Sequence, residues 1–145
     1  MSIEEQLKTK VNGSFVDRDK LHITFLFLGD TFIPENNIIS SIDAAYGGEK
    51  EIDVSGLGVF PSLKRPRVLF ARVVTDLYSR YAALCGLLGL QQETSFSPHI
   101  TLCRLKGKQE NVNNIIEDYK DIKISFTSNK LSLFDSDFKN YYRIY

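Results

Sequence analysis

Residues 21–28 have the sequence LHITFLFL, and residues 99–105 have the sequence HITLCRL. Both stretches are rich in apolar, β-branched and aromatic residues. This predicts a buried strand at Leu21–Leu28, ended by Gly29-Asp30, and a second strand at His99–Leu105. In a strand, residues i and i+2 point to the same face. Each stretch therefore places an imidazole and a hydroxyl together on one face of its strand.

The tripeptide His-Ile-Thr uses both histidines of the chain, at residues 22–24 and 99–101. Seven of the 145 residues are threonine, so two unrelated histidines would both have threonine at that position in about one case in 400. A polar pair in an apolar strand is costly to bury unless both groups find partners, so it should line a core defect, a cleft or a binding site. A single copy is commonly a hydrogen-bonded core pair, whereas two copies favour a functional site.

Two imidazoles that face one another suit a displacement at phosphorus, because each titrates near neutral pH and one removes a proton while the other supplies one. The five-coordinate transition state carries extra negative charge, which the hydroxyls of Thr24 and Thr101 would stabilise as donors. A metal site is disfavoured, because there is no third histidine and neither Cys85 nor Cys103 has a useful spacing to either motif. We expect both cysteines to be reduced core thiols.

Outside the two motifs, apolar periodicity and turn residues alternate along the chain. This pattern predicts helices at 35–46, 76–88 and 112–119, a helix-tolerant start at 2–10, and strands at 52–60, 67–75, 122–126, 130–134 and 141–145. Gly47-Gly48 and Gly89 are expected to end the first two helices. The order of elements argues for an α+β domain, and the repeated tripeptide suggests a duplication into two lobes around a shared groove.

Composition limits the classes of function. Eighteen basic and eighteen acidic residues give a formal net charge of zero, so contacts with nucleic acid must be local. The polar N-terminus and the lack of an apolar run near roughly 18 residues predict a soluble, cytoplasmic protein without a membrane segment. A chain of 145 residues is expected to form a single domain over residues 1–145.

The motifs HITF and HITL resemble the paired H-x-T/S-x signatures of the 2H phosphoesterase superfamily. The longer stretches 19–29 and 96–102 are similar to its branch of bacterial and archaeal RNA 2′,3′-cyclic phosphodiesterases, which are 2′-5′ RNA ligase-like. Residues 56–61 (GLGVFP) and 65–71 (RPRVLFA) are similar to the same branch. The resemblance spans roughly residues 17 to 135, which is most of the chain.

This resemblance implies a bilobal, two-sheet α+β fold with a central groove and one H-x-T motif in each lobe. It also implies that the chain opens 2′,3′-cyclic phosphates of RNA termini or nucleotides to 2′-phosphomonoesters without a metal or other cofactor. Some relatives act in reverse as 2′-5′ RNA ligases. By this analogy, we expect His99 to be the base that activates water and His22 the acid that protonates the leaving 3′ oxygen. We expect a monomer.

Three further residues are candidates for substrate binding. In the family, a polar or basic residue five positions after the second histidine often reaches the phosphate, and Arg104 has this position. Regular alternation puts Arg104 on the face opposite His99, so a bulge or a strand end is required for it to take part. Arg67, in the basic run 64–67, is either a phosphate contact or part of an exposed turn. Phe70 either stacks on a base or packs within the protein.

The chain also departs from its relatives at its ends. Relatives usually begin with a hydrophobic strand and a helix before the segment that matches residues 2–10, and this first strand is absent here. We therefore expect a fold without the usual first strand, an open sheet edge and lower stability. The closing strand region before Tyr145 is also short. Asp135 and Asp137 would repel a phosphate and are predicted to form a turn.

Two other functions remain open from the sequence alone. The same motifs would hold a phosphate in a module that binds nucleotides or RNA ends without turnover. Alternatively, both histidines would be structural, and their replacement would lower stability rather than activity.

Overall fold

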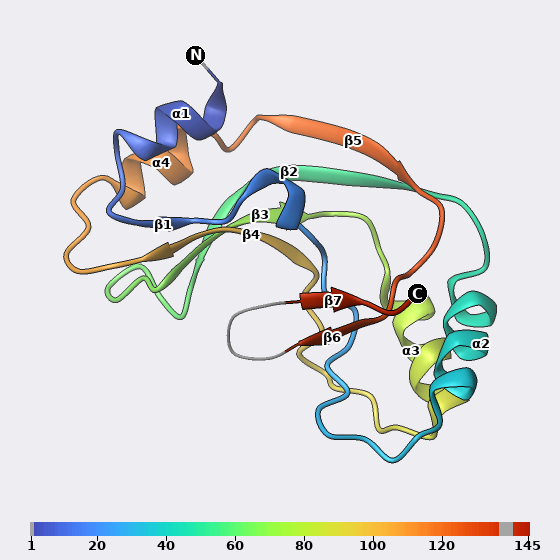
Figure 1. Cartoon of the computed structure of the whole chain (residues 1–145). Helices are drawn as coiled ribbons and strands as arrows, with labels where there is room; N and C mark the ends of the chain where they lie inside the picture. Colours follow the sequence, from blue (N-terminus) through green and yellow to red (C-terminus); the bar gives the residue numbers. More distant parts are fainter. Residues whose placement is uncertain (1, 137–140) are drawn as a thin grey trace. The chain divides into compact units, whose positions relative to one another are not determined.

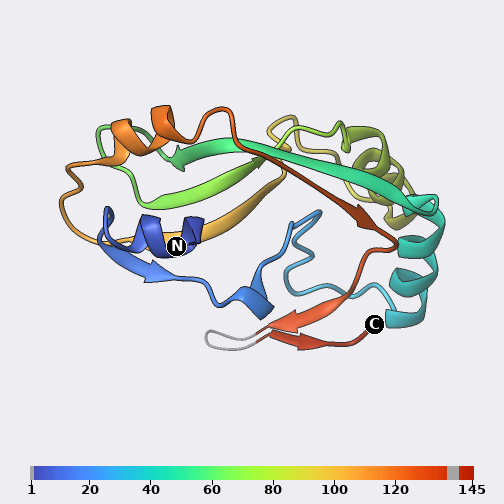
Figure 2. The same ribbon diagram turned by 90° about the horizontal axis from the view of Figure 1, so that it is seen from above.

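The computed structural model describes residues 2–136 and 141–145, and Figure 1 labels its elements. The helices are α1 (Ile3–Lys8), the short 3-10 helix η1 (Arg18–Lys20), α2 (Glu35–Tyr46), α3 (Tyr78–Leu88) and α4 (Val112–Asp118). The strands are β1 (Gly13–Phe15), β2 (Lys50–Phe60), β3 (Val68–Val73), β4 (His99–Leu105), β5 (Lys123–Ser128), β6 (Phe134–Ser136) and β7 (Tyr141–Arg143). Within the described residues, one sheet has the order β1-β4-β3-β2-β5, which can be followed in Figure 2, and the other consists of β6 and β7. The predicted α+β class is confirmed.

The chain divides into two compact units, and the first comprises residues 2–24, 52–75 and 97–126 of the described part. Its core lies on one face of the five-stranded sheet, which α1 and α4 cover (Figure 1). Leu69 of β3 and Cys103 of β4 are fully buried there against Leu7 of α1 and Ile115 of α4. The opposite face of β3 and β4 is therefore left for other side chains.

The second unit comprises residues 25–51 and 76–96 together with the described residues after 126. Its helices α2 and α3 pack together through a core formed by Ile38, Ile42, Ala45 and Leu84. Both helices end at a glycine, Gly47 and Gly89, as the sequence predicts. None of the described helices is long and apolar enough to cross a membrane.

Both cysteines are free and buried, so the prediction of reduced core thiols is confirmed. Cys85 belongs to α3, in the second unit, and Cys103 to β4, in the first. Burial raises the pKa of the Cys103 thiol, and Lys106 opposes this change only in part. Cys103 therefore remains a protonated, unreactive core residue at neutral pH.

The predicted strand Leu21–Leu28 is wrong, because only Ile23 pairs with the sheet, through a single antiparallel bridge to Ile100. Phe27 is 81% exposed, whereas Leu26 and Leu28 pack against the core formed by α2 and α3. After Thr24, the apolar residues of this run therefore pack against helices and do not form a strand. Periodicity alone cannot separate this use from a buried strand.

The predicted strand Lys130–Phe134 is wrong for the same reason. Leu131 and Leu133 pack against the second core, and strand pairing begins only at Phe134. Asp135 lies within β6 rather than in a turn, and Asp137 lies outside the described residues. The predicted hairpin of β2 and β3, the three longer helices and the strand His99–Leu105 are confirmed.

The short strand β1 was not predicted, because Asn12-Gly13 suggested a break. In the structure Gly13 pairs with Leu105, at the edge of the sheet. A Cβ at residue 13 would lie 2.3 Å from the carbonyl oxygen of Arg104. Glycine is therefore required by the close approach of the two backbones.

Truncation of the Ile115 side chain tests how much the core of the first unit contributes to stability. Ile115 is fully buried, so Ile115→Ala should lower the free energy of unfolding by about 2–5 kcal/mol, measured by urea denaturation. Leu63 is 56% exposed, so Leu63→Ala should change it by less than about 0.5 kcal/mol. Equal losses in the two variants would show that the core is placed wrongly.

Candidate active site

The bridge between Ile23 and Ile100 brings the two His-Ile-Thr motifs together. Because the pairing is antiparallel, His22 lies opposite Thr101, and Thr24 lies opposite His99. Residues directly opposite one another share a face of the sheet, with Cβ atoms about 4.5–5.5 Å apart. We call His22, Thr24, His99 and Thr101 the polar quartet.

The two histidines lie on a diagonal of the polar quartet. Diagonal neighbours in an antiparallel pair are about 7–8 Å apart, which is within reach of large side chains. The register thus lets the two imidazoles approach one small group from two sides, with a hydroxyl next to each ring. The two isoleucines of the bridge point to the other face.

Each imidazole is oriented by the backbone two residues before it. Nδ1 of His22 lies 2.8 Å from the carbonyl oxygen of Lys20, and Nδ1 of His99 lies 2.8 Å from that of Ser97. A carbonyl oxygen only accepts, so Nδ1 donates the hydrogen in both bonds. The nitrogen that gains or loses a proton is then Nε2 in both rings.

The ring of His99 is also held by two phenylalanines. The rings of Phe60 and Phe70 stack with centroids 4.3 Å apart, and they meet His99 edge-on at 5.1 and 5.2 Å. Gly58 lies opposite Phe70 in the register, and a Cβ there would lie only 2.5 Å from Cζ of Phe70. Glycine thus makes room for the ring, and Phe70 packs within the protein, which was one of the two roles expected for it.

Arg104 shares the face of the polar quartet because β4 contains a bulge. Leu69 pairs with Cys103, but the next residue, Phe70, pairs with Thr101, so Leu102 is an extra residue in β4. Arg104 pairs with Val68, which lies two residues before Phe70 and therefore on the same face as Phe70 and Thr101. The bulge that Arg104 requires is present.

Arg67 is not brought to the polar quartet. Its backbone N–H donates to the carbonyl of Phe60, and its own carbonyl accepts from Leu105. Arg67 is exposed and directly precedes β3, and alternation from Leu69 turns its side chain away from the face of Phe70. The residue of β3 that lies opposite His99 is Arg72, which was not singled out from the sequence. Arg72 is two residues after Phe70 in the predicted strand 67–75, so the two side chains share a face, and this spacing would have identified Arg72 as a candidate.

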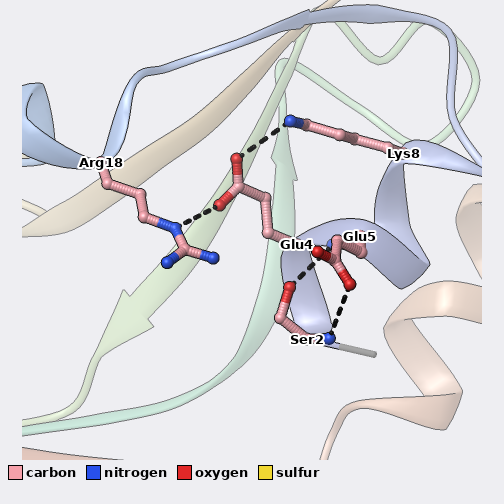
Figure 3. Close-up of polar contacts among 5 residues, drawn as sticks. All are labelled: Ser2, Glu4, Glu5, Lys8 and Arg18. Carbon is pink, nitrogen blue, oxygen red and sulfur yellow. Dashed lines mark hydrogen bonds and ion pairs between the residues drawn. The ribbon is translucent and has the colours of Figure 1, made fainter.

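A network of charges joins α1 to the segment that orients His22 (Figure 3). Ser2 and Glu5 form a capping box that begins α1, with two hydrogen bonds of 3.2 Å. Glu4 is 3.0 Å from Nε of Arg18 and 3.3 Å from Nζ of Lys8. Arg18 begins η1, and η1 ends at Lys20, the carbonyl partner of His22.

The Arg18 guanidinium beside Glu4, with a smaller effect of Lys8, lowers the pKa of the Glu4 carboxyl from its usual range. Glu4 therefore remains a carboxylate over the whole neutral range and links α1 to η1. Among residues 2–136 and 141–145, no group of three or more His, Cys, Asp or Glu side chains lies close enough together to hold a metal ion.

A family model for the LigT-like phosphoesterases matches residues 2–70 and, a second time, residues 70–141. The chain belongs to the LigT-like phosphoesterase family. Each match contains one His-Ile-Thr motif, so the duplication suggested by the sequence is supported. The two matched repeats carry one motif each, as the resemblance implied, and in this LigT-like phosphoesterase both motifs belong to the first compact unit. The reason is the Ile23–Ile100 bridge, which pairs the first motif with β4 before the chain enters the second unit.

Relatives of this LigT-like phosphoesterase share a common name. It is 32% identical to the RNA 2′,3′-cyclic phosphodiesterase of Aquifex aeolicus, over 92% of this chain and 78% of the relative. It is 26% identical to the enzyme of the same name from Methanocaldococcus jannaschii, over 92% of this chain and 80% of the relative.

Solved structures share its fold. The crystal structure of a Thermus thermophilus protein matches with a TM-score of 0.67 at 22% identity, covering 98% of this chain and 85% of the other. The crystal structure of a phosphoesterase matches with a TM-score of 0.51 at 18% identity, covering 99% and 86%.

Acid titration tests the link between Glu4 and Arg18. A carboxyl whose pKa is lowered in the folded state stabilises the protein above its unfolded pKa, and the effect is lost as the pH falls through the folded pKa. Glu4→Gln should therefore lower Tm modestly at pH 7, and the difference from the wild type should shrink to zero in acid below the usual pKa of glutamate. Thermal unfolding across pH measures this.

Glu49→Gln is the control, because Glu49 is exposed and lies between α2 and β2, away from α1 and η1 in the sequence. It should leave Tm close to that of the wild type at every pH. A Tm difference for Glu4→Gln that persists unchanged in acid would rule out the carboxylate as its cause.

Proposed function

We propose that this chain is an RNA 2′,3′-cyclic phosphodiesterase that opens the cyclic phosphate with His22 and His99 as an acid and base pair. The substrates are RNA termini or nucleotides that carry a 2′,3′-cyclic phosphate. The relatives of the same name support the reaction class. The Ile23–Ile100 bridge carries the assignment of residues, because its register sets the two imidazoles on a diagonal of one face with a hydroxyl opposite each.

In the reaction, Nε2 of His99 takes a proton from water as the water oxygen attacks phosphorus. The bond between phosphorus and the 3′ oxygen breaks, and Nε2–H of His22 protonates that oxygen. The product is a 2′-phosphomonoester with a free 3′ hydroxyl. The carbonyl groups of Lys20 and Ser97 keep hydrogen on Nδ1 throughout, so proton exchange is confined to Nε2.

Three donors on the same face stabilise the transition state. The hydroxyls of Thr24 and Thr101 donate to the non-bridging oxygens as their negative charge grows. The guanidinium of Arg104, on the quartet face because of the bulge, supplies a positive charge and several N–H groups. Phe60 and Phe70 hold the His99 ring in place. Arg67 is given no role here, because alternation turns its side chain away from the face of Phe70 and Thr101.

A single copy of the chain supplies all four members of the polar quartet, so we propose that a monomer is active. The two family matches together run from residue 2 to residue 141, which supports one phosphoesterase domain built from both compact units. We also propose that the protein acts in the cytoplasm. The two-imidazole chemistry itself requires no divalent ion.

Incubation with a nucleoside 2′,3′-cyclic phosphate in EDTA tests the reaction. We expect full turnover in chelator and the 2′-phosphomonoester as product, identified by chromatography against both isomers. Loss of turnover in EDTA would exclude the two-imidazole mechanism. Formation of the 3′-phosphomonoester would contradict the assignment of the leaving oxygen. Binding without turnover would indicate a binding module.

Replacement of the histidines tests their roles. His22→Asn and His99→Asn should each lower kcat about 10²–10⁴-fold, and the double variant should lose little more, because the two groups act as a unit. The wild type should show a bell-shaped pH profile, because one ring must be neutral and the other protonated. Urea midpoints near that of the wild type serve as the control. A clearly lower urea midpoint with kcat retained in both variants would indicate a structural role.

A further inference from the structure

We propose that Arg72 binds a second phosphate of the substrate, the 5′ phosphate of the terminal nucleotide, so that the site favours RNA ends over simple nucleoside 2′,3′-cyclic phosphates. The inference rests on the proposed function and adds a determinant of substrate size. Within residues 2–136 and 141–145, Arg72 lies opposite His99, has no side-chain partner and lines a pocket.

The register places Arg72 directly opposite His99. Opposite residues in antiparallel strands share a face and have Cβ atoms about 4.5–5.5 Å apart. Arg72 also lies two residues after Phe70, whose ring touches His99. The Arg72 side chain therefore leaves the backbone beside His99, the proposed base, on the face of the polar quartet. Arg104 lies on the same face, on the far side of Thr101 along β4.

Arg72 is exposed, and within the described part of the chain it has no ion pair and no side-chain hydrogen bond. Two other arginines of the chain have partners. Arg18 pairs with Glu4, and Arg80 lies over the ring of Tyr46 at 4.7 Å. An unpaired guanidinium with five N–H groups is suited to a phosphate, which it binds with two parallel hydrogen bonds.

Arg72 lines a pocket of about 430 Å³ next to His99. The pocket is lined by Gly58, Val59, Phe70, Arg72, Val73, Val74, Ser97 and Pro98. Ser97 accepts the hydrogen bond that orients His99, so the pocket adjoins the proposed base. A volume of this size is within the range of about 300–1,000 Å³ for pockets that bind small ligands. Arg72 is its charged residue, and the pocket has room for part of a nucleotide.

The chemistry of an RNA end supplies the ligand. From a terminal 2′,3′-cyclic phosphate, the next phosphate along the chain is the 5′ phosphodiester of the same nucleoside. A nucleoside 2′,3′-cyclic phosphate lacks this group. The Arg72 guanidinium, beside the site of the reacting phosphate, therefore distinguishes an RNA end from a nucleoside 2′,3′-cyclic phosphate. It does so without taking part in the proton transfers.

The test compares adenosine 2′,3′-cyclic phosphate with the same compound carrying a 5′ phosphate. The wild type should prefer the 5′-phosphorylated compound in kcat/KM by about ten- to a hundredfold, the value of a charged hydrogen-bonded contact. Arg72→Gln should abolish this preference and leave kcat/KM for adenosine 2′,3′-cyclic phosphate unchanged. Arg72→Lys should retain part of the preference, because it keeps the charge but loses the paired hydrogen bonds. Equal losses on both compounds in Arg72→Gln would overturn the proposal.

Lys108→Gln is the matched control, because it removes one positive charge from an exposed loop position. It should keep the wild-type preference, and a loss of preference in this variant would point to net charge and overturn the role of Arg72. Urea midpoints confirm that the variants are folded.

A binding measurement separates this proposal from the proposed function. By calorimetry, adenosine 2′,5′-bisphosphate should bind the wild type about ten- to a hundredfold more tightly than adenosine 2′-monophosphate, and Arg72→Gln should bind both equally. This outcome would support binding of the 5′ phosphate by Arg72 even if the protein shows no turnover. In that case only the proposed reaction would be contradicted. Equal binding of the two compounds by the wild type would overturn the second phosphate site.

Discussion

A single antiparallel bridge, between Ile23 and Ile100, determines the site. Each motif alone only sets an imidazole and a hydroxyl two residues apart on a strand. The bridge places each imidazole opposite the hydroxyl of the other motif, sets the two imidazoles on a diagonal, and puts all four groups on one face. The same carbonyl contact, two residues before each histidine, then fixes which nitrogen exchanges protons. The remaining features of the site modify this arrangement of two paired strands.

The sheet serves a core on one face and the site on the other, and the bulge at Leu102 reconciles these two uses of β4. Leu102 and Cys103 both contribute to the core, although they are consecutive. Without the extra residue, regular alternation would put Arg104 on the face opposite Thr101. On the site face, the stacked rings of Phe60 and Phe70 support His99, and Gly58 leaves the space for them.

The family model matches the chain twice, but the two matches do not correspond to the two compact units. The first motif ends the N-terminal part of the first unit, and the residues after Thr24 pack against helices of the second. The repeated motif is therefore a record of sequence duplication, and the physical site depends on strand pairing within one unit. The charged contacts of Glu4 and Arg18 hold the helix α1 to the turn before His22.

The sequence by itself determined the features that depend on near neighbours. The glycines after Tyr46 and Leu88 set the ends of two helices, and the i, i+2 spacing in His-Ile-Thr set each polar pair. Strand His99–Leu105 was also determined locally. Only the tertiary structure decided that residues 25–28 pack on helices, that Arg67 is turned away, and that Arg72 and Arg104 share the site face. These outcomes depend on register and packing between residues far apart in the chain. Local alternation pairs Arg72 with Phe70 on one face of a strand, but it does not tell which face carries the site.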